Sequence, residues 1–207
     1  MRRDLDEMAG RVGLTAILNV VPTLSGQPAG VFFGHHQAAF RRGVELARAI
    51  YGVGYRVRPD IVFSNSHPCE LDFWQAHKSQ YPAQMMVKPG GTIILAAPCP
   101  EGISPVHSDL VEFASLSSGE LQARYGRGEL TNGTAVALAT AWALVREKAA
   151  VITYSPGLSD RELLALGHTR APSLAWAVEE ALRRQGAGAK ISVLTHGPDL
   201  LPLWRGD

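Results

Sequence analysis

A glutamine and a lysine three residues apart are the side chains of this sequence best suited to holding a small anion. Gln75 and Lys78 lie in a segment, 71–78, that is predicted to form a helix just after a strand-end loop. On a helix, residues i and i+3 share one face, so a neutral amide and a cation would lie side by side. Such a pair suits a small carboxylate or hydroxy acid. The plainer alternative is a solvated helix face, because glutamine and lysine are common on surfaces.

Polar loops follow four of the predicted strands. These loops are residues 64–67, 98–102, 154–156 and 195–197. In open α/β sheets, ligands bind at the carboxyl ends of the strands, so we expect the four loops to converge on one pocket. We therefore add Ser64 and Asn65 to Gln75 and Lys78 as candidate substrate-binding residues, and assign neither a catalytic residue nor a metal ligand. The alternative is that these loops are polar only because loops face water.

The histidines and cysteines give weaker signals. His35 and His36 are adjacent, so their side chains diverge and a shared metal ion is less expected than a role at a helix start. His67 and Cys69 are two residues apart, which does not establish a catalytic dyad, and buried inert cysteines are common. We expect the tryptophans at 74, 142 and 176 to be core residues.

Several mechanistic motifs are missing. The sequence has no G-x-G-x-x-G after a strand, no G-x-x-x-x-G-K-[ST] and no G-x-S-x-G. A Rossmann dinucleotide site, a P-loop and an α/β-hydrolase nucleophile are therefore not expected. The motif Asn132-Gly-Thr134 matches a glycosylation acceptor but carries little meaning in a cytoplasmic chain.

The elements that must position these residues follow from the apolar patterns. The first part predicts a helix that begins almost at Met1 and has its apolar stripe at 5–12, then two hairpin strands at 15–21 and 30–33 and a second helix at 38–51. Gly13 is expected to end the first helix in a left-handed cap. From residue 60 onward, strands are predicted at 60–65, 92–97, 150–154 and 190–194. The helices between and after them are predicted at 71–78, 109–114, 120–125, 133–148, 161–166 and 173–185, with Ser108, Ser118 and Ser159 as caps.

Strands that alternate with helices are typical of a parallel sheet covered on both faces. We therefore expect an α/β fold: a mostly parallel sheet flanked by helices in three layers, with the N-terminal β-hairpin at one edge. We expect residues 1–207 to form a single domain, because no linker, repeat or low-complexity tract interrupts them.

Composition narrows the classes of protein. The 207 residues carry 20 Lys+Arg against 19 Asp+Glu, so no strong positive field favours nucleic acid. Two cysteines cannot build a disulfide scaffold. The apolar runs are too short to span a membrane, and acidic residues follow the first arginines where a signal peptide needs an apolar stretch. We expect a cytoplasmic protein without nucleic-acid or membrane partners.

An ordered set of blocks resembles the carboxyl-terminal half of the nickel-dependent lactate racemase family. The blocks lie at 3–9, 13–14, 17–21, 30–34, 60–65, 71–72, 75–78, 90–95 and 99–102, with Ala38, Gly43 and Pro68 between them. The resemblance implies a protein about twice this long, with two α/β domains and a cleft between them. It implies that an absent amino-terminal domain, the expected partner, holds a nickel-pincer nucleotide and the two histidines that exchange the substrate proton.

The implied reaction removes a hydride from the carbinol carbon of a 2-hydroxy acid and returns it to either face. The resemblance maps the family's substrate-orienting groups onto Gln75 and Lys78. Arg2 or Arg3 stands where a nickel-ligand histidine is expected, and 133–135 lack the pocket tryptophan of lactate racemases. We therefore expect another small 2-hydroxy acid or sugar acid as substrate, and no cofactor in this chain alone.

Three functional hypotheses follow. The first is the substrate-side half of a racemase or epimerase, which alone should fold but not racemise lactate. The second is a non-catalytic α/β module that binds a small anion, and the third is a nucleotide-binding domain, which lacks its glycine fingerprint. If the first holds, we expect exposed apolar residues around the strand ends, where the absent domain would dock.

Overall fold

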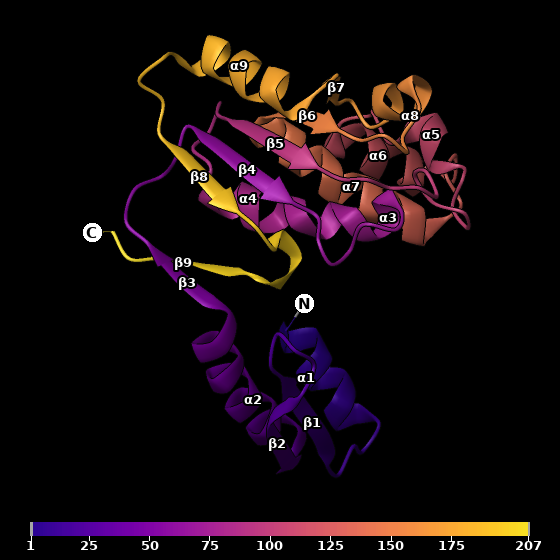
Figure 1. Cartoon of the computed structure of the whole chain (residues 1–207). Helices are drawn as coiled ribbons and strands as arrows, with labels where there is room; N and C mark the ends of the chain where they lie inside the picture. Colours follow the sequence, from indigo (N-terminus) through magenta and orange to yellow (C-terminus); the bar gives the residue numbers. More distant parts are fainter. Residues whose placement is uncertain (1, 207) are drawn as a thin grey trace. The chain divides into compact units, whose positions relative to one another are not determined.

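The structure, a computed structural model, describes residues 2–206 and divides into two compact units at the Gly54–Tyr55 bond. The first unit contains α1 (Arg2–Arg11), β1 (Ile17–Pro22), β2 (Pro28–Gly34) and α2 (His36–Tyr51) (Figure 1). As predicted, Gly13 follows α1 in the left-handed region, with φ +68°. The predicted hairpin is confirmed: β1 and β2 are antiparallel, with Leu18 opposite Phe33 and Val20 opposite Val31.

Helix α2 covers one face of the hairpin. Alternate residues on that face are partly or fully buried, and they include Val21 and Phe32. A Cβ added to Gly43 of α2 would lie 3.7 Å from both of these side chains, which places the helix backbone against them. His36 begins α2, and its ring Nδ1 lies 3.2 Å from the Leu14 carbonyl. The predicted helix-start position of this histidine is therefore confirmed.

The second unit is built on a parallel sheet of five strands, in the order β7-β6-β5-β4-β8. These strands are β4 (Ile61–Asn65), β5 (Thr92–Ala96), β6 (Ala150–Tyr154), β7 (Thr169–Arg170) and β8 (Ile191–Leu194). Every pairing among them is parallel. The hairpin forms a two-stranded sheet of its own, so its expected place as an added edge of this sheet is wrong. Two further short strands are β3 (Gly52–Tyr55) and β9 (Leu201–Trp204).

Alternating residues of the sheet fill two separate cores, which gives the three predicted layers. Val62, Ile93 and Val151 pack into the larger core, whereas Ile61, Ile94 and Ile152 pack against α9 (Leu174–Gln185) on the opposite face (Figure 1). These β-branched side chains are between 0% and 3% exposed. Continuous apolar runs form these strands because both faces of the sheet are covered.

The helices of the larger face, in chain order, are α3 (Phe73–Ala76), α4 (Gln80–Met86), α5 (Leu110–Phe113), α6 (Ser118–Gly126), α7 (Gly133–Lys148) and α8 (Asp160–Ala165). A 3₁₀ turn, His77–Ser79, joins α3 to α4, and another covers Gly197–Asp199. The predicted cap Ser159 is confirmed as part of a capping box with Glu162. Two predicted caps are wrong: Ser117 rather than Ser118 caps α6, and Asp109 precedes α5 without a side-chain cap.

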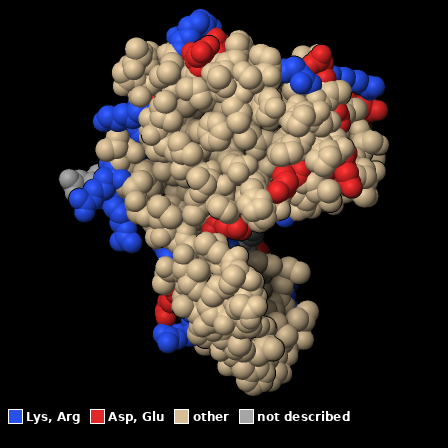
Figure 2. All heavy atoms as spheres, viewed as in Figure 1, with Lys and Arg blue, Asp and Glu red and all other residues tan. Residues whose placement is uncertain are grey.

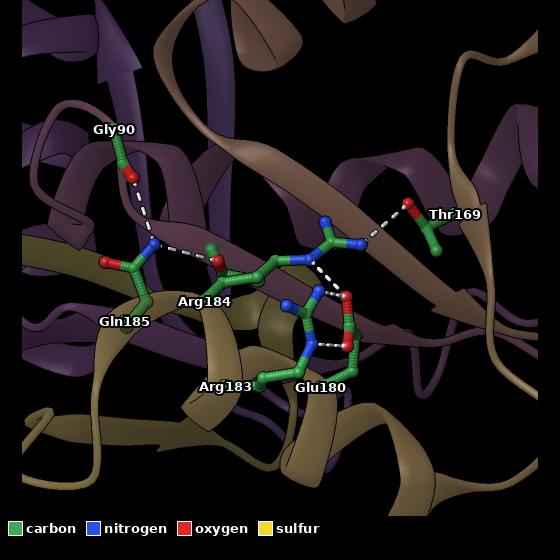
Figure 3. Close-up of polar contacts among 7 residues, drawn as sticks. Gly90, Thr169, Glu180, Arg183, Arg184 and Gln185 are labelled. Atoms are coloured by element: carbon green, nitrogen blue, oxygen red, sulfur yellow. Dashed lines mark hydrogen bonds and ion pairs between the residues drawn. The ribbon is translucent and has the colours of Figure 1, made fainter.

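Polar contacts hold α9 on its face of the sheet (Figure 3). Gln185 donates from Nε2 to the Gly90 carbonyl at 3.0 Å and to the Thr92 hydroxyl at 3.1 Å, at the start of β5. Glu180 accepts hydrogen bonds from Arg183 and Arg184, which lower the pKa of its carboxyl to about 2.

Within residues 2–206, no helix is long and apolar enough to cross a membrane.

Candidate functional site

The candidate site lies at the edge of the sheet where the parallel strands end. Strands β4 and β8 are neighbours and run parallel, so the residues that follow them emerge side by side. The turn Gly197–Asp199, after β8, contacts the turn His77–Ser79 and helix α4, which follow β4. Ligands of open α/β sheets bind beyond the carboxyl ends of the strands. The residues that follow β4 and β8 therefore frame the candidate site.

Gln75 and Lys78 lie together, as their spacing predicts. Lys78 Nζ donates a hydrogen bond to Gln75 Oε1 at 2.5 Å. Gln75 is half-buried on α3, whereas Lys78 is exposed on the 3₁₀ turn. The segment therefore presents an ammonium group and an amide at one place on its surface.

Backbone contacts fix the start of α3. The Asp72 carboxylate accepts the Gln75 N–H at 2.8 Å and caps the helix. The N–H groups of Phe73 and Trp74 donate to the carbonyls of Gly102 and Ile103, each at 2.9 Å. Because all three donors of this first turn are satisfied, the backbone that carries Gln75 is anchored to the loop that follows β5.

The loops after the strands lie against one another, as expected. Asn65 Nδ2 donates to the Thr195 carbonyl at 3.1 Å, which joins the ends of β4 and β8. Ser155 Oγ donates to the Pro98 carbonyl at 3.1 Å, which joins the ends of β5 and β6. The Ser64 hydroxyl points inward: it is fully buried and donates to the Ser79 carbonyl at 2.9 Å, beneath the turn that carries Lys78. A pocket bounded by these loops stays a prediction.

A second polar group gathers where β4 and β8 end. His67 Nδ1 lies 2.9 Å from Glu70 Oε1, and the His67 ring meets the His196 ring edge to face at 5.2 Å. His67 Nδ1 is engaged by Glu70 and Cys69 is a free cysteine, so the structure gives no support to the thiol dyad considered for His67 and Cys69. Among residues 2–206, no three His, Cys, Asp or Glu side chains are grouped to hold a metal ion.

An aromatic pair beside Gln75 was not predicted from the sequence. The Trp74 and His107 rings stack at 4.1 Å with 16° between their planes. The Asn132 side chain, which caps α7, places Nδ2 3.3 Å from His107 Nδ1 and 3.0 Å from the Asp109 carboxylate. Trp74 is half-buried and packs on the larger core, so the expectation of a core residue holds in part.

Buried titratable groups near the site are held neutral. Burial, with a smaller effect of the Lys78 charge, lowers the pKa of His77 to about 4. Burial, with the charge of Asp72, raises the pKa of the Cys99 thiol to about 12, so this cysteine is not a nucleophile at neutral pH. Trp142, whose ring lies 5.5 Å from that of His77, is fully buried, as expected of a core residue.

Close packing fixes the loop after β5. The Gly157 N–H donates to the Pro98 carbonyl at 2.9 Å, and a Cβ at this position would collide with the Cys99 carbonyl. Glu162 Oε1 accepts the Ile103 N–H at 2.8 Å. Burial by itself would raise the pKa of the Glu162 carboxyl, but hydrogen bonds from Ser159 and Ile103 lower this pKa by a larger amount. The net shift is downward, so the carboxylate stays ionised.

Comparisons with known proteins agree with this architecture. No family model matches the sequence. Lactate racemase from Thermoanaerobacterium thermosaccharolyticum is 31% identical over 103 residues, which are 49% of this chain and 24% of that protein. The solved apoprotein of that racemase covers 97% of this chain at TM-score 0.84 and 24% identity. A solved Thermotoga maritima protein covers 98% at TM-score 0.66 and 14% identity, a likeness of fold alone.

The chain spans about half of each of these solved structures, 49% of the racemase and 52% of the Thermotoga protein. The sequence similarity and the shared α/β fold both point to the relative that the ordered sequence blocks had indicated. The chain is therefore similar to lactate racemase in sequence over about half of its length and in its α/β fold.

Proposed function

We propose that this chain is the substrate-side part of a 2-hydroxy-acid racemase or epimerase. The observation that carries the proposal is the Lys78–Gln75 hydrogen bond, on a segment anchored to the loop that follows β5, beyond the carboxyl ends of the strands. The ammonium group supplies a charge for a substrate carboxylate, and the amide supplies a neutral hydrogen bond to the carboxylate or the hydroxyl. Ser64 and Asn65 support this surface by fixing the turn and the β8 loop.

The rest of the reaction lies outside the residues described. The proposal assigns a nickel-pincer cofactor to an amino-terminal domain, which would be the partner of this chain in the cytoplasm. Residues 2–206 group no three metal-ligating side chains, so by themselves they do not fit a nickel site. What this chain contributes is binding and orientation of a small 2-hydroxy acid or sugar acid by Gln75 and Lys78.

The experiment is a binding titration that separates the two polar contacts. Side-chain NMR signals of Lys78 and Gln75 are followed while lactate, lactamide or propionate is added to the chain. Lactamide lacks the carboxylate charge, and propionate lacks the hydroxyl. We expect lactamide to bind about ten- to a hundredfold more weakly than lactate, and propionate about two- to tenfold more weakly.

A second series of acids finds the preferred substrate. Larger 2-hydroxy acids and sugar acids are titrated in the same way, because the substrate is expected to differ from lactate. Equal binding of propionate and lactate, with loss for lactamide, would favour the alternative of a module that binds small anions without reading the hydroxyl. No shift of either side chain with any of these acids would refute the proposed site.

A further inference from the structure

One face of the hairpin in the first unit is apolar and exposed to solvent. Leu18, Val20, Val31 and Phe33 are 64%, 50%, 57% and 77% exposed, and we call them the hairpin apolar face. They share one side of the sheet because Leu18 is opposite Phe33 and Val20 is opposite Val31 in the antiparallel register. The other side of the same strands is covered by α2.

This face has the composition of a core rather than of a surface. A strand pair with one covered side normally turns polar residues outward, but here both sides of the hairpin carry large apolar residues. Sheets that carry large apolar residues on both faces are normally covered on both faces. In the view of Figure 2, most of the first unit's visible surface carries neither Lys, Arg, Asp nor Glu.

Other parts of the first unit also leave apolar side chains and strand edges uncovered. Helix α1 has no buried residue, and its apolar stripe of Leu5, Met8 and Val12 is 52% to 77% exposed. The hairpin is a sheet of two strands, so each strand is paired on one side only. An isolated two-stranded sheet is marginally stable in water, and unpaired edges with an apolar face favour the addition of further structure.

We propose that the hairpin apolar face docks the part of a lactate-racemase-like protein that this chain does not span. The argument for this occupant is length: this chain matches the racemase structure over 97% of its own residues but over 49% of the other chain, so a second half of comparable size exists in that relative. The inference rests on the proposed function, which assigns the cofactor to that half.

The placement differs from what the sequence led us to expect. Exposed apolar residues do occur near the strand ends, at Leu71 and Val106, which are 54% and 82% exposed. They are separate residues, however, and isolated apolar residues on a surface are normal. The contiguous set lies on the hairpin, so the first unit, rather than the strand-end loops, carries the docking surface.

The test uses the whole chain and a defined probe. The part of the Thermoanaerobacterium thermosaccharolyticum racemase outside the matched region is co-expressed as a separate polypeptide, and the complex is measured by size-exclusion chromatography with light scattering. We expect a one-to-one complex. Phe33→Glu and Leu18→Glu should each weaken it at least about tenfold, because each buries a charge in the contact.

A matched control is available in the second unit. Leu164 on α8 is 76% exposed, against 77% for Phe33, so Leu164→Glu makes the same change at the same exposure outside the hairpin apolar face. It should leave the complex intact. Far-ultraviolet circular dichroism of the three variants should match the unaltered chain, because none of the three side chains is buried.

Two results would overturn the inference. One is the absence of any complex with the probe at a concentration of about 100 μM, where even weak docking registers. The other is a dimer of this chain alone that Phe33→Glu separates, because the face would then belong to a second copy. Neither result touches the acid titration at Lys78 and Gln75, so a failure of docking and a failure of the proposed function are distinguishable.

Discussion

Lys78 occupies the amide oxygen of Gln75, which leaves the amide nitrogen of Gln75 free to donate elsewhere. A lysine ammonium only donates, so the Gln75 atom at 2.5 Å from Nζ must be the oxygen. The pair therefore offers an incoming ligand N–H donors from the ammonium and from the amide, while the amide oxygen keeps a second lone pair as an acceptor. A carboxylate, which only accepts, is the matching partner.

The charged and the neutral donor make substitutions at the two positions unequal. Lys78→Ala should weaken acid binding about ten- to a hundredfold, because a charge-assisted contact is worth about 1.5–3 kcal/mol, and Gln75→Ala about two- to tenfold. The two effects should not add fully in the double variant, since both groups act on one small ligand. Calorimetric or NMR titration of the two single variants and the double variant checks this.

Two further variants sharpen the test. Gln75→Glu should bind acids more weakly than Gln75→Ala, because it places a like charge beside the ligand. Lys88→Ala removes a partly exposed lysine that pairs with Asp60 before β5, away from Gln75, and should leave binding unchanged. Unaltered binding by Lys78→Ala would show that the pair is a solvated helix face.

The His107 ring should carry its proton on Nε2. Asn132 Oδ1 accepts the Ala135 N–H at 3.2 Å, so the amide nitrogen of Asn132 must face His107 Nδ1. A ring nitrogen that accepts from this amide carries no proton. Long-range proton–nitrogen NMR should therefore show Nδ1 unprotonated at neutral pH.

The substitution Asn132→Asp gives a direct check on that assignment. Aspartate is an equally good helix cap, so α7 should keep its start. It replaces the amide donor with an acceptor, and the proton should then appear on His107 Nδ1. A ring that already holds its proton on Nδ1 in the unaltered chain would contradict the argument.

Gly157→Ala should destabilise the second unit by about 2–4 kcal/mol. The added Cβ would collide with the Cys99 carbonyl, and backbone on both sides leaves no flexible side chain to give way. Urea unfolding followed by tryptophan fluorescence measures this, because all four tryptophans lie beyond residue 54. Gly119→Ala, on α6 with open space around the position, should be neutral or stabilising by up to about 1 kcal/mol. Equal stability of the two variants would refute the close approach.

The second unit should lose stability as the pH falls below about 6.5. Burial lowers the pKa of His77 to about 4 and that of His168 to about 3, with smaller effects of Lys78 and Arg146. Between their ordinary pKa of 6.5 and these values, the unfolded chain binds protons that the folded chain does not. The free energy of unfolding therefore rises with pH in this window, by at most about 1.4 kcal/mol per pH unit for each histidine.

A variant isolates the contribution of one ring. In His168→Gln, the slope of unfolding free energy against pH between 6.5 and 4 should decrease by the share of one histidine. His196→Gln serves as the control, because its ring is exposed and should leave the slope as it is. A slope that His168→Gln does not change would show that this ring is protonated in the folded state.

Local patterns predicted four of the five parallel strands, the hairpin and the longest helix well. The apolar runs of β4 and β5 and the helix 133–148 are set by nearby residues, and their bounds agree to within a residue. The two-residue strand β7 and helix α4 were not predicted; Pro82 is tolerated in the first turn of α4, where its missing N–H has no partner to lose. The helix expected over 71–78 ends at Ala76 and continues as a 3₁₀ turn.

In the candidate site too, contacts between residues close in sequence were predicted, whereas contacts between distant residues were not. Gln75 and Lys78 meet because they are three residues apart, a distance that a single turn of helix fixes. The contacts of His67 with His196 and of Trp74 with His107 join residues that are far apart in the chain. They depend on strand order and loop path, which no local pattern encodes.

The place of β8 in the sheet has a consequence for how the protein is made. β4 lies between β5 and β8, and its Ile61–Ser64 stretch pairs with Ile191–Leu194, about 130 residues later. During synthesis, β4 therefore keeps an unpaired, apolar edge until nearly the whole chain has left the ribosome. Thr195 follows β8, so its contact with Asn65 at the end of β4 forms only after β8 has taken its place in the sheet.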